Sequence, residues 1–137
     1  MEINEITDRV LAAAVEVHRR LGPGLLESPY AECLAFEMRR RGLRFRREVR
    51  LPLVYDGHRI DCAYRLDFLV GGQVVLELKA ERSLQPIHGA QLLTYLRLGG
   101  FPVGLLLNFN TRYLGGGSVR RVVNGYAGPR PSGDAAQ

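Results

Sequence analysis

One carboxylate and one ammonium interrupt a short apolar run, Val75-Leu76-Glu77-Leu78-Lys79. Lys79 is the only lysine among the 19 Lys and Arg residues of the chain. Lysine supplies a compact, mobile point charge, whereas arginine supplies a planar, delocalised fork. Two interpretations stay open at this point. Either this position needs a compact charge, or a strongly arginine-biased composition retains a single lysine by chance.

Asp67 is the second acidic residue that could act together with this run. In a strand, Glu77 and Lys79 project from the same face. Asp67 lies ten residues before Glu77, across Gly71-Gly72, so a hairpin would bring the two carboxylates close together. Two carboxylates and an ammonium on a largely buried sheet are costly unless they pair or bind a cation. A cross-strand salt-bridge face is the simpler alternative.

A hard divalent ion is the cation that such carboxylates suit best. Oxygen ligands favour Mg²⁺ or Mn²⁺. Such an ion could polarise a phosphoryl oxygen and generate hydroxide from a bound water, while Lys79 orients the water or stabilises the developing charge. The spacing of Asp67, Glu77 and Lys79 is therefore compatible with metal-assisted phosphoryl chemistry.

Two helices are expected before these strands. Asn4 can cap the first, whose apolar residues recur at helical spacing until Gly22-Pro23-Gly24 ends it. Ser28 and Pro29 have the residue types of an N-cap and a first helical position. This second helix should run to about Arg41, followed by a C-terminal glycine.

From residue 45 onward the apolar residues alternate with a period of two, which predicts strands. Asp56-Gly57 and Gly71-Gly72 supply turns for a meander of three strands, and Pro52 makes the first of them an edge strand. A helix from about Pro86 to just before Gly99-Gly100 permits a parallel crossover to a fourth strand. The strands are expected at residues 45–55, 59–70, 73–79, 101–110 and 119–123.

This order of elements predicts an α/β fold of the mixed α+β kind, with a mixed central β-sheet flanked by α-helices. A chain of 137 residues allows one sizeable core and leaves little room for a second domain. We expect the domain to span residues 1–124. Residues 125–137 are rich in Gly, Pro, Ser and Ala and lack an apolar face, which predicts a disordered C-terminal tail.

The chain is expected to be a cytoplasmic protein. No apolar stretch approaches the roughly 18 residues of a membrane span. The acidic N-terminus lacks the basic-then-apolar pattern of a signal peptide.

The formal net charge of +5 is unevenly distributed. Seven arginines lie between residues 39 and 50, opposed there only by Glu48: Arg39, Arg40, Arg41, Arg44, Arg46, Arg47 and Arg50. Such a patch fits attraction to a polyanion such as nucleic acid. The alternative is a solvated helix end whose cations complement the helix dipole. Arg44, Arg46 and Arg47 are the candidate nucleic-acid-binding residues.

The chain resembles the PD-(D/E)XK nuclease superfamily, and especially its RecB-like branch. The resemblance lies in Asp67, then Glu77-x-Lys79, then Gln91-x-x-x-Tyr95 on the following expected helix. The segment Gly24-Leu25-Leu26-Glu27-Ser28-Pro29-Tyr30 matches the signature of the GxxExxY protein family within the superfamily. An E-x-K motif alone is weak, but the four elements in this order are specific. The usual motif proline is absent, because Leu66 precedes Asp67.

The resemblance implies a role for each matching residue and a restriction-endonuclease-like core. Asp67 and Glu77 match metal-binding carboxylates, to which the Leu78 carbonyl commonly adds an oxygen, and Lys79 matches the catalytic lysine. Glu27 matches a helical glutamate that often completes the metal shell. The implied supporting or substrate-contacting residues are Gln91, Tyr95 and Tyr30.

The function implied is a Mg²⁺- or Mn²⁺-dependent nuclease that hydrolyses phosphodiester bonds, in DNA rather than RNA. A chain with little material beyond the catalytic core would need a second copy to cut both strands, so a homodimer is expected. Two alternatives share the fold: a catalytically inactive nucleic-acid-binding module, and a regulatory subunit whose partner supplies the chemistry.

Overall fold

The computed structural model describes residues 1–125, except for the side chains of residues 62 and 63. From residue 126 onward, the predicted C-terminal tail lies outside the described residues. No helix in the described part of the chain combines the length and apolar character needed to cross a membrane.

The described strands form one five-stranded sheet in the order β1-β2-β3-β4-β5. Neighbouring strands are antiparallel except β3 and β4, which are parallel. The mixed α+β fold is thereby confirmed, and so are the edge position of β1 and the parallel crossover through a helix. The strand bounds are β1 Phe45–Tyr55, β2 His58–Val70, β3 Val74–Lys79, β4 Val103–Asn108 and β5 Val119–Val123.

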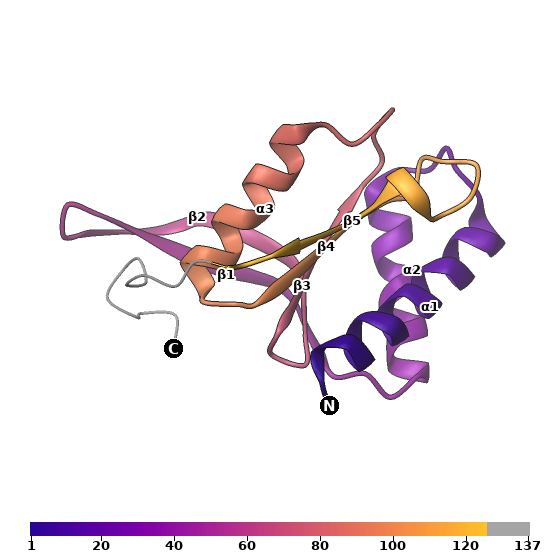
Figure 1. The fold of residues 1–137 in the computed structure, drawn as a ribbon, viewed down its shortest axis with the longest axis horizontal. Coiled ribbons are helices and arrows are strands. Elements are labelled where there is room, and N and C mark those ends of the chain that lie inside the picture. The colour runs from indigo at the N-terminus through magenta and orange to yellow at the C-terminus, as the bar shows by residue number, and fades with distance from the viewer. Residues whose placement is uncertain (126–137) are drawn as a thin grey trace.

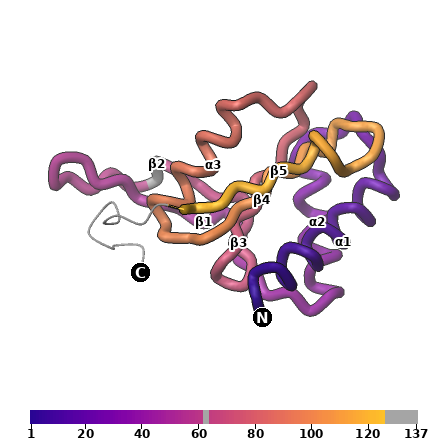
Figure 2. The backbone as a smooth tube through the Cα atoms, viewed as in Figure 1, coloured from indigo at the N-terminus to yellow at the C-terminus, as the bar shows by residue number. Residues whose placement is uncertain are grey.

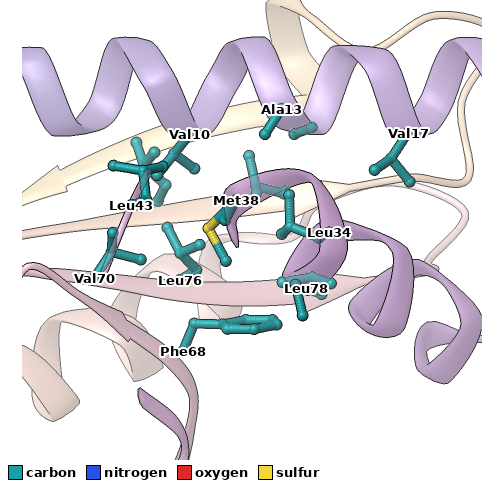
Figure 3. Close-up of a cluster of buried hydrophobic side chains, with 14 of the residues drawn as sticks. Val10, Ala13, Val17, Leu34, Met38, Leu43, Phe68, Val70, Leu76 and Leu78 are labelled. Carbon is teal, nitrogen blue, oxygen red and sulfur yellow. The ribbon is translucent and has the colours of Figure 1, made fainter. Parts of the chain in front are cut away.

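Helices cover both faces of the sheet, as Figure 1 shows. Helix α1 (Ile3–Leu21) and helix α2 (Glu27–Arg40) pack on one face, and helix α3 (Pro86–Gly99) packs on the other. Figure 3 shows the apolar core on the face covered by α1 and α2, where side chains of these helices pack against those of β2 and β3. Its labelled residues are Val10, Ala13, Val17, Leu34, Met38, Leu43, Phe68, Val70, Leu76 and Leu78.

The helix starts differ slightly from the sequence expectation. Glu2, not Asn4, occupies the N-cap of α1, and α2 begins at Glu27 rather than after Ser28. Pro29 therefore lies within the first turn of α2 instead of at its first position. A proline is tolerated there because the first backbone N–H groups of a helix have no intrahelical partner. Because of this shift, Glu27 is the first residue of α2, and its side chain extends from the start of the helix.

The β1–β2 hairpin extends beyond the part of the sheet that the helices cover, as the tube in Figure 2 shows. Exposure rises along it, so that Tyr55 near the turn is 69% exposed while Leu51 is 6% exposed. The hairpin is continuous with the site at its base, because β2 carries Asp67.

The close approach of α3 to the sheet depends on Gly104 in β4. A Cβ added there would lie 2.8–2.9 Å from three carbons of the Leu92 side chain, which is 1% exposed. Leu92 belongs to α3 and is adjacent in sequence to Gln91. The absence of a side chain at residue 104 therefore sets the position of the helix that carries Gln91 and Tyr95.

We predict that Gly104→Ala lowers the free energy of unfolding by about 1–3 kcal/mol, because the buried Leu92 side chain must shift to make room for the added Cβ. Chemical denaturation monitored by circular dichroism measures the change. Gly117→Ala is the matched control, since a Cβ at residue 117 meets nothing within 4 Å. Equal stability of the two variants would contradict the packing argument.

Candidate active site

Strands β2 and β3 separate at the two acidic residues. Their ladder runs from Val70↔Val74 to Phe68↔Leu76 and stops there, although Asp67 and Glu77 would be the next pair. The side chains replace the missing backbone bonds. Asp67 Oδ2 accepts a hydrogen bond from the Leu78 N–H at 2.8 Å, and the Asp67 N–H points to Glu77 Oε1 at 3.4 Å. The opening between the strands is thus lined by both carboxylates.

A change of side-chain direction along β2 accompanies this opening. Residues two apart in a strand normally share a face. Phe68 packs under α1 and α2, yet Leu66 packs under α3, so the alternation shifts at Asp67. Glu48 lies opposite Asp67 in the β1–β2 register, between the paired residues Arg47↔Phe68 and Val49↔Leu66. Its φ is 53°. Such a left-handed conformation is uncommon for a residue with a side chain. Both strands therefore bend at the candidate site.

Glu77 is the most strongly perturbed acid of the site. It is 8% exposed, and its pKa is raised to about 9, first of all by burial and then by the Asp67 charge and a hydrogen bond with Asp67. The Lys79 charge opposes these effects only in part. A carboxyl group with this pKa stays protonated at neutral pH unless additional positive charge arrives. A cation bound next to Glu77 would stabilise the ionised form of its carboxyl group.

Lys79 and Glu27 complete the cluster. Burial raises the pKa of Glu27 first of all, and the Asp67 and Glu81 charges raise it further. The Lys79 charge and a hydrogen bond from the Ala80 backbone lower it. These effects operate at short range, so the start of α2 lies against the end of β3. The structure thus brings together the predicted residues Glu27, Asp67, Glu77 and Lys79.

The Leu78 carbonyl also faces the opening. The Lys79 carbonyl accepts a hydrogen bond from the Phe109 N–H, on the β4 side. Backbone groups of successive strand residues point to opposite sides, while the N–H and C=O of one residue point to the same side. Because the Leu78 N–H points at Asp67, the Leu78 carbonyl points toward β2 as well.

These donors fit a hard divalent cation. Among the side chains that the structure describes, no three of His, Cys, Asp or Glu are arranged to hold a metal ion by themselves. Mg²⁺ does not require three, because it keeps several waters and binds through one or two carboxylates together with substrate phosphates. Asp67 and Glu77, with the Leu78 carbonyl, supply such a partial shell. The raised pKa of Glu77 is the electrostatic signature of a site that a cation would stabilise.

A pocket of about 280 Å³ lies beside these donors, between α2 and the base of the β1–β2 hairpin. Arg47 forms part of its wall, with its guanidinium 5.2 Å from the centre of the Phe68 ring and 2.9 Å from Glu32. The lining residues are Glu27, Ser28, Ala31, Glu32, Arg47, Glu48, Arg65, Asp67, Phe68 and Leu78. The pocket lining thus combines carboxylates with two guanidiniums, and each guanidinium pairs with one of these carboxylates.

The other two candidate arginines do not face this pocket. Arg46 is paired with Leu69, whose side chain packs under α3, so Arg46 lies on the opposite face of the hairpin. Arg44 lines a separate pocket near Gly71 and Gln73, at the start of β1. Of the three, only Arg47 is placed beside the carboxylates.

Tyr95 and Gln91 border the site from α3. Tyr95 is 9% exposed, and its ring centre lies 5.3 Å from that of Tyr64 on β2. Burial raises the pKa of Tyr95, and the Glu77 charge raises it further, which places the phenol near that carboxyl. Gln91 is exposed one turn earlier on the same helix.

Tyr30 anchors the loop before α2 from within the core. It is fully buried, and its ring stacks on Phe109 with 4.6 Å between centres. Its hydroxyl donates to the Gly22 carbonyl and accepts from the Leu25 N–H. Both hydrogen-bonding capacities of the hydroxyl therefore serve the loop that leads to Glu27.

Asn108 is a positioning residue that the sequence analysis did not single out. It is 3% exposed at the end of β4. Its side chain accepts from the Glu81 N–H and donates to the Glu81 carbonyl, each at 3.0 Å. These two hydrogen bonds to the Glu81 backbone hold the segment that follows Lys79 in place. A polar residue ending an otherwise apolar buried strand is the signal that could have revealed it.

We predict that Glu77→Gln makes the protein more stable than the native chain at high pH in the absence of divalent ions. Between pH 4.5 and 9, unfolded Glu77 has lost a proton that folded Glu77 retains, so the native free energy of unfolding falls as pH rises. The stability gap should grow through this window, by at most about 1.4 kcal/mol per pH unit. Thermal unfolding at several pH values measures it, and a constant gap would refute the assigned burial effect.

We also predict that Asn108→Ala destabilises the fold by about 1–3 kcal/mol, because it leaves the Glu81 N–H without its partner and the Glu81 carbonyl with only the longer bond from Asn110. Urea unfolding measures the change. Asn110→Ala is the matched control, since Asn110 is exposed and makes a longer 3.3 Å bond to the same carbonyl. A loss in the control as large as that in Asn108→Ala would argue against the special role of Asn108.

The comparisons with known proteins agree with this geometry. The sequence profile of the PD-(D/E)XK nuclease superfamily matches residues 4–122, which include every element that builds the site. No curated protein and no solved structure matches the chain. The match confirms the resemblance of the sequence at the level of the superfamily and accounts for the restriction-endonuclease-like arrangement of sheet and helices. The chain belongs to the PD-(D/E)XK nuclease superfamily.

Proposed function

We propose that this protein is a Mg²⁺- or Mn²⁺-dependent nuclease that hydrolyses phosphodiester bonds in DNA. The observation that carries the proposal is the pairing of Asp67 and Glu77 across the opening between β2 and β3, next to Lys79. A nuclease-type function follows from membership of the superfamily. The DNA substrate, the metal requirement and the assignment to the GxxExxY group of the RecB-like branch are our proposals.

Asp67 and Glu77, with the Leu78 carbonyl, hold the cation in this proposal, and Glu27 stands at the start of α2 to complete its shell. When bound, the cation supplies Lewis-acid polarisation of a phosphoryl oxygen and lowers the pKa of a bound water. Because the pKa of Glu77 is raised to about 9, its carboxyl must lose a proton on binding, and cation affinity should increase with pH.

Lys79 supplies the mobile positive charge of the site. It shares a strand face with Glu77 and influences the pKa of both Glu77 and Glu27, so its ammonium lies near both carboxyl groups. From that position it orients the attacking water or stabilises the charge that develops on the phosphoryl oxygens. Tyr95, whose raised pKa keeps its phenol protonated, borders the same space as a hydrogen-bond donor.

We predict that the native chain cleaves labelled DNA in Mn²⁺ or Mg²⁺ and that EDTA abolishes cleavage. Glu77→Gln and Lys79→Met should each reduce the rate by about 100-fold or more, as removal of a group that stabilises transition-state charge does. The measurement is product formation on a panel of single-stranded, duplex and branched DNA and matching RNA. Asp8→Asn, which removes an exposed carboxylate on α1, is the control and should retain full activity.

Each other outcome of this panel points to a defined alternative. Undiminished cleavage by both site variants would place the chemistry elsewhere. Binding of DNA without product in either metal would favour the inactive binding module. Neither binding nor cleavage would favour the regulatory subunit. A preference for RNA would correct the substrate, and the size of the active species in solution tests the expected homodimer.

A further inference from the structure

We propose that Arg47, Arg50 and Arg65 bind the phosphate backbone of the strand that the site acts on, so that this strand runs outward along the β1–β2 hairpin. We call these three residues the arginine row. The inference rests on the proposed function, since it names how the same site holds its nucleic acid. It replaces Arg44 and Arg46 by Arg50 and Arg65 as the binding residues.

The register of the hairpin places two arginines directly opposite each other. Arg50 of β1 is the Cα partner of Arg65 of β2, and both are exposed. Directly opposite residues have their Cβ atoms about 4.5–5.5 Å apart, and like charges at this spacing are destabilising. A cost of this kind is offset when an anion lies between the two guanidiniums.

The arginine row lies on the same face as the pocket. Arg47 and Arg65 both line the pocket that Asp67 and Leu78 share. Arg50 shares the face of Arg65 because cross-strand partners point to the same side. The opposite face of this part of the hairpin is apolar and covered, since Leu51 and Leu66 pack under α3. The charged face is therefore the one that is open to a ligand.

The counter-charges of the row are weak and replaceable. Arg65 pairs with Glu48 at 3.1 Å, and Arg47 pairs with Glu32 at 2.9 Å, but these two carboxylates are 60% and 66% exposed. Exposed ion pairs of this kind contribute little stability. Arg50 has no ion-pair partner within residues 1–125. A phosphate oxygen can thus replace these carboxylates as the partner of the guanidiniums at a low cost in free energy, because it forms charge-assisted hydrogen bonds with them.

Arg47 is held in place at the wall of the pocket by contacts of its own side chain. Its guanidinium lies over the Phe68 ring, and its Nε atom is buried without a hydrogen-bond partner. Arg47 lies at the base of the hairpin beside Asp67, and Arg50 and Arg65 lie further out along β1 and β2. The row therefore extends from the carboxylates outward along the hairpin.

The experiment compares two double variants with the same change in net charge. In Arg50→Ala/Arg65→Ala the row is broken, and in Arg44→Ala/Arg46→Ala two exposed arginines outside it are removed. Binding of fluorescein-labelled single-stranded and duplex DNA is measured by anisotropy at several salt concentrations, in Ca²⁺. We expect the first variant to lose at least about 10-fold in affinity and its log–log salt slope to fall by nearly two units, as for two lost phosphate contacts. The second should stay near the native values.

Equal losses in both variants would overturn the proposal, because they would show only an effect of total charge. Failure of the native chain to bind any DNA would overturn it as well. Circular dichroism melting guards against misfolding, and Arg50→Ala alone should not lower the melting temperature because it relieves a like-charge pair. Cleavage is scored separately: selective loss of binding in a chain that cleaves nothing would sustain the arginine row while sinking the nuclease.

Discussion

The separation of β2 from β3 at Asp67 and Glu77 is the constraint on which the site depends. A sheet normally pairs every backbone group of neighbouring strands, and here two carboxylates take over that role at the point where the ladder ends. Burying Glu77 beside the Asp67 charge costs free energy, and the raised pKa of Glu77 expresses this cost. In the proposed function, a bound cation would offset this cost.

The rest of the molecule fixes the two edges of this opening. Helix α2 presents Glu27 from its first residue, and the buried Tyr30 hydroxyl anchors the loop before it. On the far side, Asn108 holds the backbone that follows Lys79. Gly104 lets α3 approach the sheet so closely that the Glu77 charge raises the pKa of Tyr95. Tyr30, Asn108 and Gly104 thus help to position the residues that we propose to act in the reaction.

The sequence predicted the elements well, and it predicted that Asp67 and Glu77 meet across the β2–β3 hairpin, because both depend on local signals. Period-two alternation, Gly-containing turns and the spacing of Asp67 from Glu77 determine which residues meet across the hairpin. The arginine cluster could not be resolved in the same way. Which arginines face the pocket depends on the shift of alternation at Asp67 and on the φ of 53° at Glu48, and no residue type in this stretch signals either. The role of Asn108 likewise needs a tertiary contact across 27 residues.

The central claim is that Asp67, Glu77 and the Leu78 carbonyl hold a divalent cation. Crystals grown with Mn²⁺ and measured near its absorption edge test this claim directly, because anomalous scattering locates the ion without reference to activity. The account predicts a Mn²⁺ peak in the opening between β2 and β3, at about 2.0–2.2 Å from oxygens of the two carboxylates. A fully occupied ion bound elsewhere, or an opening that stays without a peak at saturating Mn²⁺, would contradict it.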